Sequence, residues 1–526
     1  MLNRLKRCLV LTAALVLLAF PGAAGAETVL RVVMPNDLNI IDPVFTTSHL
    51  TRNHGYMVYD TLFAMDSKGK PQPQMVEKYE MSSDGLVYTF TLRSGLAWHD
   101  GKPVTAADCV ASLKRWGQKD RLGKMLFKVV KSLEVKDAKN FQMVLTKKSG
   151  FVIDALGEAS GNVPFMMPER LARTPVSKQI KDPIGSGPFI MKTDEWSPGN
   201  KAVYIKNPNY KPRSEPPDAL AGGKVVKVDR VEWLYIPDDG TAQAALMAGE
   251  IDFLLQPRFE MIPTLSKLSD IVVDTLISSG NQNILRPNFL HPPFNHPKAR
   301  EALLYLINQE QYMKLVIGNP KFYRTSYALF MSGTPYASEV GTEALKAFDP
   351  EKAKQLFKEA GYDGRPIVLL QQKTTNHFKA ATVTAQNLRR IGIKVKVKPV
   401  TGAMFFQERA VKKPPEQGGW NLFHTHFNMT TIANPLTNSP LASSCNQQGW
   451  PGWPCDPKIE ELKAKFAEEP DFEKRKKIAV EIQKEWSKYI THAWIGEHFI
   501  PSAWRKNLSG LIKAPIPVFW NVVKKK

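Results

Sequence analysis

The stretch that says most about the fold is residues 83–108, which read SDGLVYTFTLRSGLAWHDGKPVTAAD. Val87 to Leu92 places its large apolar side chains at every second position, which predicts a strand with one buried face. Asp100-Gly101 predicts a tight turn. Thr105, followed three residues later by Asp108, predicts the capped start of a helix. A strand, a turn and a helix in such a short segment indicate a mixed α/β protein.

Similar patterns extend on both sides of this segment. Asp238 and Gly249 predict the two ends of one helix, and Asp349-Pro350 and Gly361 predict those of another. Further helices are expected over Ala299–Ile317, Pro457–Phe466 and Phe472–Ile490, and a strand over Ile393–Val400. Helix-to-strand units of this kind usually pack helices on a sheet, so we expect an α/β fold in two lobes, the second beginning near residue 280.

Composition limits the class of protein. The chain has 526 residues, of which 43% are hydrophobic and 23% charged, close to the average for globular proteins. At roughly 100–200 residues per domain this length allows about two to four domains. Disordered, collagen-like and coiled-coil classes are therefore excluded, and 39 prolines argue against a helical bundle.

The first 26 residues are expected to be removed. Arg4, Lys6 and Arg7 form a positive segment, Val10 to Phe20 is apolar, and Ala24-Gly25-Ala26 has the small-residue pattern of a cleavage site. Residues 1–26 are therefore predicted to be a signal peptide cleaved near Ala26, which exports the mature chain to the periplasm. A retained membrane anchor is the alternative.

The basic charge gives no sign of a nucleic-acid partner. Removal of the signal peptide lowers the net charge from +21 to +18, and the remaining lysines and arginines are spread along the chain. No zinc-finger spacing, RNA-binding aromatic signature or helix-turn-helix pattern is present. A solvated basic surface is the simpler interpretation.

Three cysteines remain after processing. Cys445 and Cys455 flank a loop rich in Gly and Pro, so in an oxidising compartment we expect them to form a disulfide. A metal site would need a third thiol nearby, and none is there. Cys109 lies in a predicted helix and is expected to be free and buried.

Enzyme signatures are absent. The sequence has no zinc-protease helix, P-loop, nucleophile elbow or dinucleotide-binding glycine motif. The S-x-x-K string at Ser67 to Lys70 lacks the motifs that accompany it in serine acylases and is interpreted as a turn. His424 and His426 would share one face of a strand as a possible metal pair, but no nearby carboxylate or thiolate completes a site. We therefore expect a binding protein without a cofactor or resident metal; an exported hydrolase is the remote alternative.

Several segments together resemble a known family. Residues 83–108, IGSGPF at 184–189, AGEID at 248–252, and the helix from Asp349 to Tyr362 are similar to the bacterial family-5 extracellular solute-binding proteins, and they occur in the family's order. These are the oligopeptide-, dipeptide- and nickel-binding components of ABC importers.

The resemblance implies a Venus-flytrap architecture. Lobe I would comprise residues 27–71, 186–279 and 498–526, an inserted subdomain residues 72–185, and lobe II residues 280–497. Ser278–Pro287 and His492–Pro501 would form the hinge. Residues 83–108 would be structural and would not touch ligand. A monomer would capture a peptide-like or other small solute between the lobes and deliver it to an inner-membrane permease.

The resemblance also points to a ligand site, with one departure. Peptide-binding relatives hold the ligand's ammonium group with an aspartate that follows a tryptophan in lobe II. Here the corresponding stretch, residues 417–455, contains no Asp, Glu, Lys or Arg. A buried ammonium without a carboxylate partner would be costly, so ordinary peptide binding is in doubt.

Neutral contacts are expected instead. The predicted substrate-binding residues are Trp420, His424, His426 and Asn428, with Lys373 as an anion contact where dipeptide-binding relatives place a basic residue. Any of the residues in the uncharged stretch could instead fill a core. A nickel chelate or another non-peptide solute, neutral, aromatic or sugar-like, remains the alternative ligand.

Overall fold

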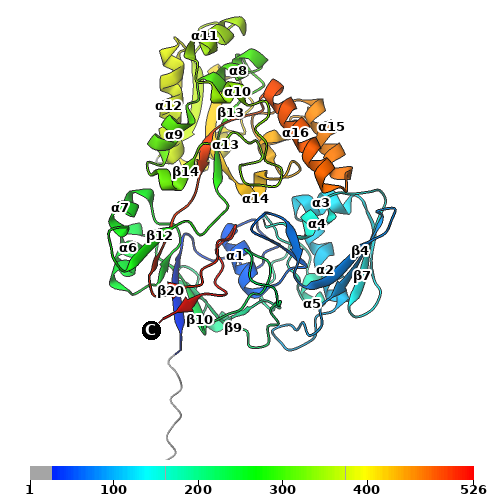
Figure 1. Ribbon diagram of the computed structural model, residues 1–526. Coiled ribbons are helices and arrows are strands. Elements are labelled where there is room, and N and C mark those ends of the chain that lie inside the picture. Colours follow the sequence, from blue (N-terminus) through cyan, green and yellow to red (C-terminus); the bar gives the residue numbers. More distant parts are fainter. Residues whose placement is uncertain (1–26, 160, 374, 526) are drawn as a thin grey trace, which may run out of the picture.

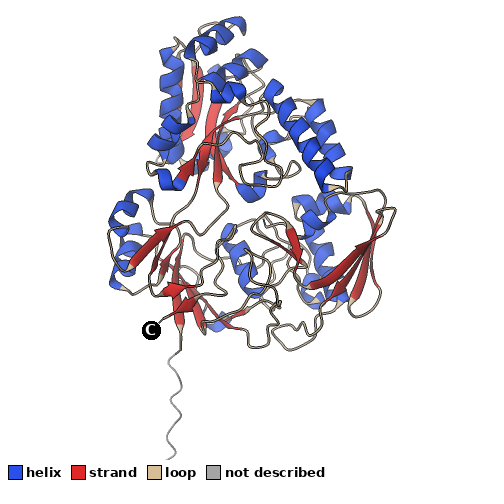
Figure 2. Ribbon diagram, viewed as in Figure 1, coloured by secondary structure: helices blue, strands red, loops and turns tan. Residues whose placement is uncertain are grey.

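The structure is a computed structural model that describes residues 27–159, 161–373 and 375–525. The predicted signal peptide, residues 1–26, lies outside the described residues. Figure 1 shows an upper and a lower body, and Figure 2 shows helices packed around the sheet of the upper one. The predicted α/β class is confirmed. We keep the names lobe I, inserted subdomain and lobe II for the parts of the chain built on the three largest described sheets.

Lobe I is built on a seven-stranded sheet of order β12-β19-β11-β1-β10-β9-β8. Its central strand β1 runs parallel to both β10 and β11. The predicted helix after Asp238 is confirmed as α6, because the Asp238 side chain accepts a hydrogen bond from Thr241 N at 2.7 Å and Gly249 ends the helix at φ +79°. The elements are β1 (Val29–Met34), β8 (Phe189–Met191), β9 (Lys201–Lys206), β10 (Arg230–Tyr235), β11 (Phe253–Leu254), β12 (Ile271–Asp274), β19 (Ser502–Arg505), α1 (His49–Val58), α6 (Asp239–Ala248) and α7 (Ile262–Leu265).

The inserted subdomain contains an antiparallel sheet of order β4-β5-β7-β6. The predicted strand is β5, whose Phe90 is fully buried and stacks on Phe141 at 5.0 Å between ring centroids. The predicted capping box is also confirmed, with Thr105 and Asp108 bonded to each other's backbone at the start of α2. The elements are β4 (Val76–Met81), β5 (Val87–Leu92), β6 (Val130–Val135), β7 (Asn140–Leu145), α2 (Ala106–Gly117), α3 (Arg121–Phe127), α4 (Val152–Leu156) and α5 (Glu169–Ala172). The short hairpin β2 (Phe63–Met65) to β3 (Pro71–Pro73) leads into it from lobe I.

Lobe II is built on a six-stranded sheet of order β14-β18-β13-β17-β15-β16. The helix that follows Asp349 is confirmed as α11, but the single helix predicted over Ala299–Ile317 is wrong. The Asn308 side chain accepts a hydrogen bond from Gln311 N at 3.0 Å and starts a separate helix there. The strands are β13 (Asn281–Pro287), β14 (Tyr323–Arg324), β15 (Ile367–Gln372), β16 (Val395–Val400), β17 (Leu422–Asn428) and β18 (Ala493–His498). The helices are α8 (Pro297–Tyr305), α9 (Gln309–Val316), α10 (Glu343–Lys346), α11 (Pro350–Glu359), α12 (Asn376–Arg390), α13 (Gly402–Glu408), α14 (Met429–Ile432), α15 (Pro457–Glu468) and α16 (Phe472–Tyr489).

The lobes are joined in two ways. The chain crosses from β12 to β13 through residues 275–280 and returns from β18 to β19 through residues 499–501 (Figure 1), and these crossings overlap the segments predicted as the hinge. Away from the hinge, the inserted subdomain contacts the ends of α15 and α16, which descend toward α3 and α4 in Figure 1. Lys147 pairs with Glu468 at 2.6 Å, and Gly150 N donates to Ala467 O at 2.9 Å. The region between the lobes is therefore bounded by the hinge on one side and by the contacts of the inserted subdomain with lobe II on the other. The residue boundaries assigned to the lobes stay predictions.

The loop between Cys445 and Cys455 is closed by a disulfide in the structure, with an S–S distance of 1.99 Å. Cys109 is free and buried in α2. None of the described helices is both long and apolar enough to cross a bilayer.

Candidate functional site

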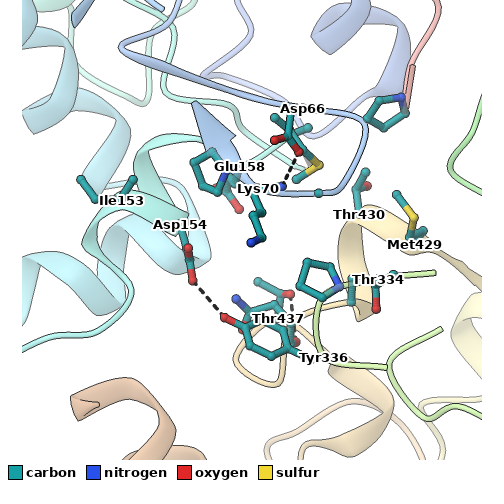
Figure 3. Close-up of a pocket in the computed structure, with 18 of the residues that line it drawn as sticks. Asp66, Lys70, Ile153, Asp154, Glu158, Thr334, Tyr336, Met429, Thr430 and Thr437 are labelled. Atoms are coloured by element: carbon teal, nitrogen blue, oxygen red, sulfur yellow. Dashed lines mark hydrogen bonds between the residues drawn. The ribbon is translucent and has the colours of Figure 1, made fainter. Parts of the chain in front are cut away.

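A cavity of about 610 Å³ lies between the lobes. Figure 3 shows that its lining comes from all three parts of the chain, and its volume falls in the range of small-molecule sites. The β2–β3 hairpin and the inserted subdomain contribute Met65, Asp66, Lys70, Tyr79, Met81, Tyr88, Ile153, Asp154 and Glu158, whereas lobe II contributes Arg324, Thr334, Tyr336, Met429, Thr430, Asn434, Thr437, Phe472 and Arg475.

One wall of the cavity carries apolar side chains of the inserted subdomain. Tyr79 and Met81 are 41% and 47% exposed, so they leave apolar surface at the cavity. Tyr88 comes from the next strand and also lines the cavity. Tyr88 belongs to the segment expected to be structural, and it is both packed and at the cavity wall. The expectation that this segment does not touch ligand stays a prediction.

An ion pair connects the inserted subdomain with lobe II across the cavity. Arg475 Nη2 lies 3.4 Å from Asp154 Oδ2, and Tyr336 Oη lies 3.5 Å from the same carboxylate oxygen. Arg475 also donates to Gly150 O of the subdomain. Burial raises the pKa of Asp154, and the neighbouring guanidinium opposes that shift. These contacts hold the two parts together at the cavity.

Lobe II, on the opposite side, contributes the charged Arg324 and Arg475 and also an uncharged wall. This wall is formed by α14 and the residues after it, including Met429, Thr430, Asn434 and Thr437. Asn428 fixes this wall, because its Oδ1 accepts from Thr430 N at 3.1 Å and its Nδ2 donates to Ser279 Oγ at 3.1 Å. The wall is thus attached to the hinge segment and presents hydroxyl and amide groups to the cavity.

Two predicted site residues lie in the core of lobe II instead. Trp420 is 1% exposed, and its indole N–H donates to Arg409 O at 3.1 Å. His424 is also 1% exposed, with Nε2 2.7 Å from Thr384 Oγ1, and burial lowers its pKa to about 3. Apolar packing covers the stacking face of Trp420, and a neighbouring hydroxyl bonds Nε2 of His424, so neither side chain faces the cavity in this structure and their contact with ligand stays a prediction.

The other three predicted residues lie at the surface or beside the cavity. His426 is exposed, and its Nδ1 lies 3.1 Å from His377 Nε2. Asn428 acts through the wall that it caps. Lys373 is exposed at the end of β15. None of the five predicted residues lines the described cavity, and the structure does not bring them together into one site. Their role in ligand binding stays a prediction.

Histidines from different elements gather around His426. His377 stacks on it at 5.0 Å between ring centroids, and His498 approaches edge-on at 5.7 Å. Burial lowers the pKa of His377 and His498, and nearby His426 lowers both further. Over the described residues, no three His, Cys, Asp or Glu side chains converge in a way that could hold a metal ion.

Sequence reasoning missed the residues that line the cavity. Lys70 belongs to the S-x-x-K string, whose sequence predicts only a turn. Asp154, Tyr336 and Arg475 come from separate segments that only the tertiary fold brings together. Thr430 belongs to the uncharged stretch, in which Trp420 and the histidines are the side chains best suited by type to bind a ligand.

Comparison with known proteins identifies the class. Residues 70–450 match the model of the bacterial extracellular solute-binding proteins, family 5. The "Probable peptide ABC transporter periplasmic-binding protein y4tO" of Sinorhizobium fredii is 39% identical over 512 residues, which cover 97% of this chain and 96% of the relative. The glutathione-binding protein GsiB of Salmonella typhi is 29% identical over 447 residues, covering 82% and 80%.

Solved structures agree in fold. The substrate-binding protein CtaP of Listeria monocytogenes superposes with a TM-score of 0.80 at 20% identity, over 95% of this chain and 100% of that chain. The oligopeptide-binding protein AppA of Bacillus subtilis, solved with a nonapeptide, gives 0.72 at 21% identity, over 95% and 100%. The chain therefore belongs to family 5 of the bacterial extracellular solute-binding proteins and has their two-lobed fold, which confirms the predicted family and architecture.

Proposed function

We propose that this chain is the periplasmic peptide-binding component of an ABC importer and that its ligand occupies the cavity between the lobes. The observation that carries the proposal is the cavity itself. It has a ligand-sized volume, and its walls come from both sides of the hinge. The names of the y4tO and AppA relatives support a peptide as the ligand.

The mechanism is closure around the ligand. A ligand that contacts both walls favours the closed form in proportion to its differential affinity for the two forms. Thr430 and Asn434 present groups suited to peptide N–H and C=O on the lobe II side, and Tyr79 and Met81 offer apolar contact on the other. The permease would recognise the closed shape.

The ligand's amino terminus finds no carboxylate partner on the lobe II wall around Thr430. This wall therefore does not require a free ammonium group. Peptides with a blocked amino terminus therefore belong among the expected ligands, together with free-amine peptides.

The remaining assignments follow from this role. The mature protein is a monomer beginning near Glu27 after signal-peptide cleavage, it uses no cofactor, and it catalyses no reaction. N-terminal sequencing, solution mass, and assays for peptide or ester turnover test these points. Intact residues 1–26 in the membrane fraction, or turnover that persists through purification, would contradict them.

Native mass spectrometry of gently purified protein tests the ligand class. We expect a bound mass that fragments as a peptide, and calorimetric binding of peptides in preference to neutral glycosides and nickel chelates. Binding of nickel chelates alone would support the alternative ligand and would direct attention to the pair formed by His377 and His426.

A further inference from the structure

We infer that Lys70 binds the ligand's carboxylate and so gives the cavity a preference for peptides with a free carboxyl terminus. This inference rests on the proposed function and deepens it. It assigns the ionic contact to the β2–β3 hairpin, on the side of the cavity opposite the uncharged wall of lobe II. It also replaces Lys373, which does not line the cavity.

The backbone around Lys70 is held in one conformation. Lys70 N donates to Asp66 Oδ1 at 2.9 Å, and Asp66 N donates to Lys70 O at 2.9 Å, which closes the turn between β2 and β3. Gly69 takes φ +74°, a value that other residues rarely adopt. The stem of Lys70 therefore starts from a fixed position, and Figure 3 shows its side chain directed into the cavity.

The nearest acidic residue in the turn is already occupied. Asp66 is 7% exposed, and its carboxylate also accepts from Lys68 N at 2.9 Å and from Gln72 Nε2 at 2.8 Å. The Asp66 carboxylate oxygens are therefore occupied by hydrogen bonds from within the turn. The Lys70 ammonium lies 4.8 Å from the centroid of the Phe472 ring, which attracts a cation without neutralising it.

The other cations of the cavity have carboxylate partners. Arg475 pairs with Asp154, and Arg324 pairs with Glu497 at 2.6 Å. Among the described residues, no ion pair involves Lys70. Lys70 is therefore the cavity cation whose charge an incoming anion can meet without displacing an existing partner.

A carboxylate is the anion that a peptide ligand brings. Hydrogen bonds between an ammonium and a carboxylate are shorter and stronger than neutral ones. Closure places such a pair between the walls, where less water competes for it. An amide at the same position would accept only a weaker bond from Lys70.

The test compares two peptide libraries and three variants. Mature protein is offered an equimolar mixture of tetrapeptides with free carboxyl termini, and separately the same mixture with amidated carboxyl termini, with retention measured by native mass spectrometry. The most retained sequence is then titrated in both forms by calorimetry against wild type, Lys70→Gln, Lys70→Arg and the control Lys68→Gln. Lys68 is an exposed lysine of the same turn that does not line the cavity.

We expect wild type and Lys68→Gln to bind the free acid about ten- to a hundredfold more tightly than the amide. Lys70→Gln should abolish this preference, because it weakens binding of the free acid far more than binding of the amide, and Lys70→Arg should keep part of it. Equal binding of both libraries, or a preference that survives in Lys70→Gln, would overturn the role of Lys70 but leave the peptide function standing. Retention of neither library would instead overturn the peptide function, and this inference with it.

Discussion

The two walls of the cavity differ in how they handle charge. The wall formed by the hairpin and the inserted subdomain contains Lys70 and Asp154, whereas the lobe II wall around Thr430 carries no charge. The uncharged stretch of lobe II has two uses, since its Trp420 end packs in the core and its Thr430 end faces the cavity. The absence of charge in this stretch is thus compatible with both a packed core and a cavity wall. Only the fold shows which residues belong to each.

The largest effect is expected from breaking the ion pair on the charged side. Arg475→Ala leaves the largely buried Asp154 without its ion-pair partner and should lower the free energy of unfolding by about 3–5 kcal/mol. The control Lys476→Ala removes an exposed ion pair and should cost about 0–1 kcal/mol. Urea titration measures both. Equal, small losses in the two variants would show that the pair does not hold the wall.

The second prediction concerns the disulfide between Cys445 and Cys455, which stabilises the end of the uncharged stretch. Replacing Cys445 and Cys455 together by Ala should lower the free energy of unfolding by about 3 kcal/mol, because the open loop gains freedom in the unfolded chain. Alkylation of unfolded, unreduced wild type should label Cys109 alone. Labelling of all three thiols would show that the bridge is absent in solution.

Acid should weaken both lobes through buried histidines. Burial lowers the pKa of His54 in lobe I and of His424 in lobe II to about 3. Because these folded-state values lie below the unfolded value of about 6.5, the unfolded chain binds more protons as pH falls, and the stability present above pH 6.5 is lost below it. Each residue should cost about 2 kcal/mol between pH 7 and pH 5.

The histidine contribution is isolated by substitution. His424→Gln, which keeps a group able to bond Thr384, should reduce the pH dependence of urea unfolding over this window. A pH dependence identical to that of wild type would show that His424 is not held neutral.

The smallest effect is expected from placing a charge on the uncharged wall. Thr430→Asp adds a carboxylate at the cavity and should favour free-amine peptides over their N-acetyl forms by about tenfold, or ~1.4 kcal/mol. Thr430→Asn is the uncharged control and should show no such change. Calorimetry with matched peptide pairs measures the ratio, and an unchanged ratio in Thr430→Asp would place the ligand's amino terminus elsewhere.

Local structure was predictable where single residues decide it. The caps at Thr105, Asp238 and Asp349 and the terminating Gly249 mark real helix ends, because each satisfies backbone groups locally. The break at Asn308 was missed because the apolar periodicity continues through it. Amphipathic spacing alone does not reveal where a cap interrupts a helix.

The cavity was less predictable, because its residues meet only through tertiary contacts. Asp154 and Arg475 are far apart in sequence, and nothing near either one indicates its partner. Lys70 looked like any lysine in a turn, and its function depends on the direction that the hairpin gives it. The sequence suggested Trp420 as a stacking surface for ligand, because a residue's type does not reveal whether tertiary packing buries its ring.

A crystal structure with a bound peptide tests the central claim most directly. The account predicts peptide density in the cavity between the lobes, with its carboxylate at Lys70 and its backbone against Thr430. Peptide density beside His377 and His426, with the cavity filled only by water, would contradict it.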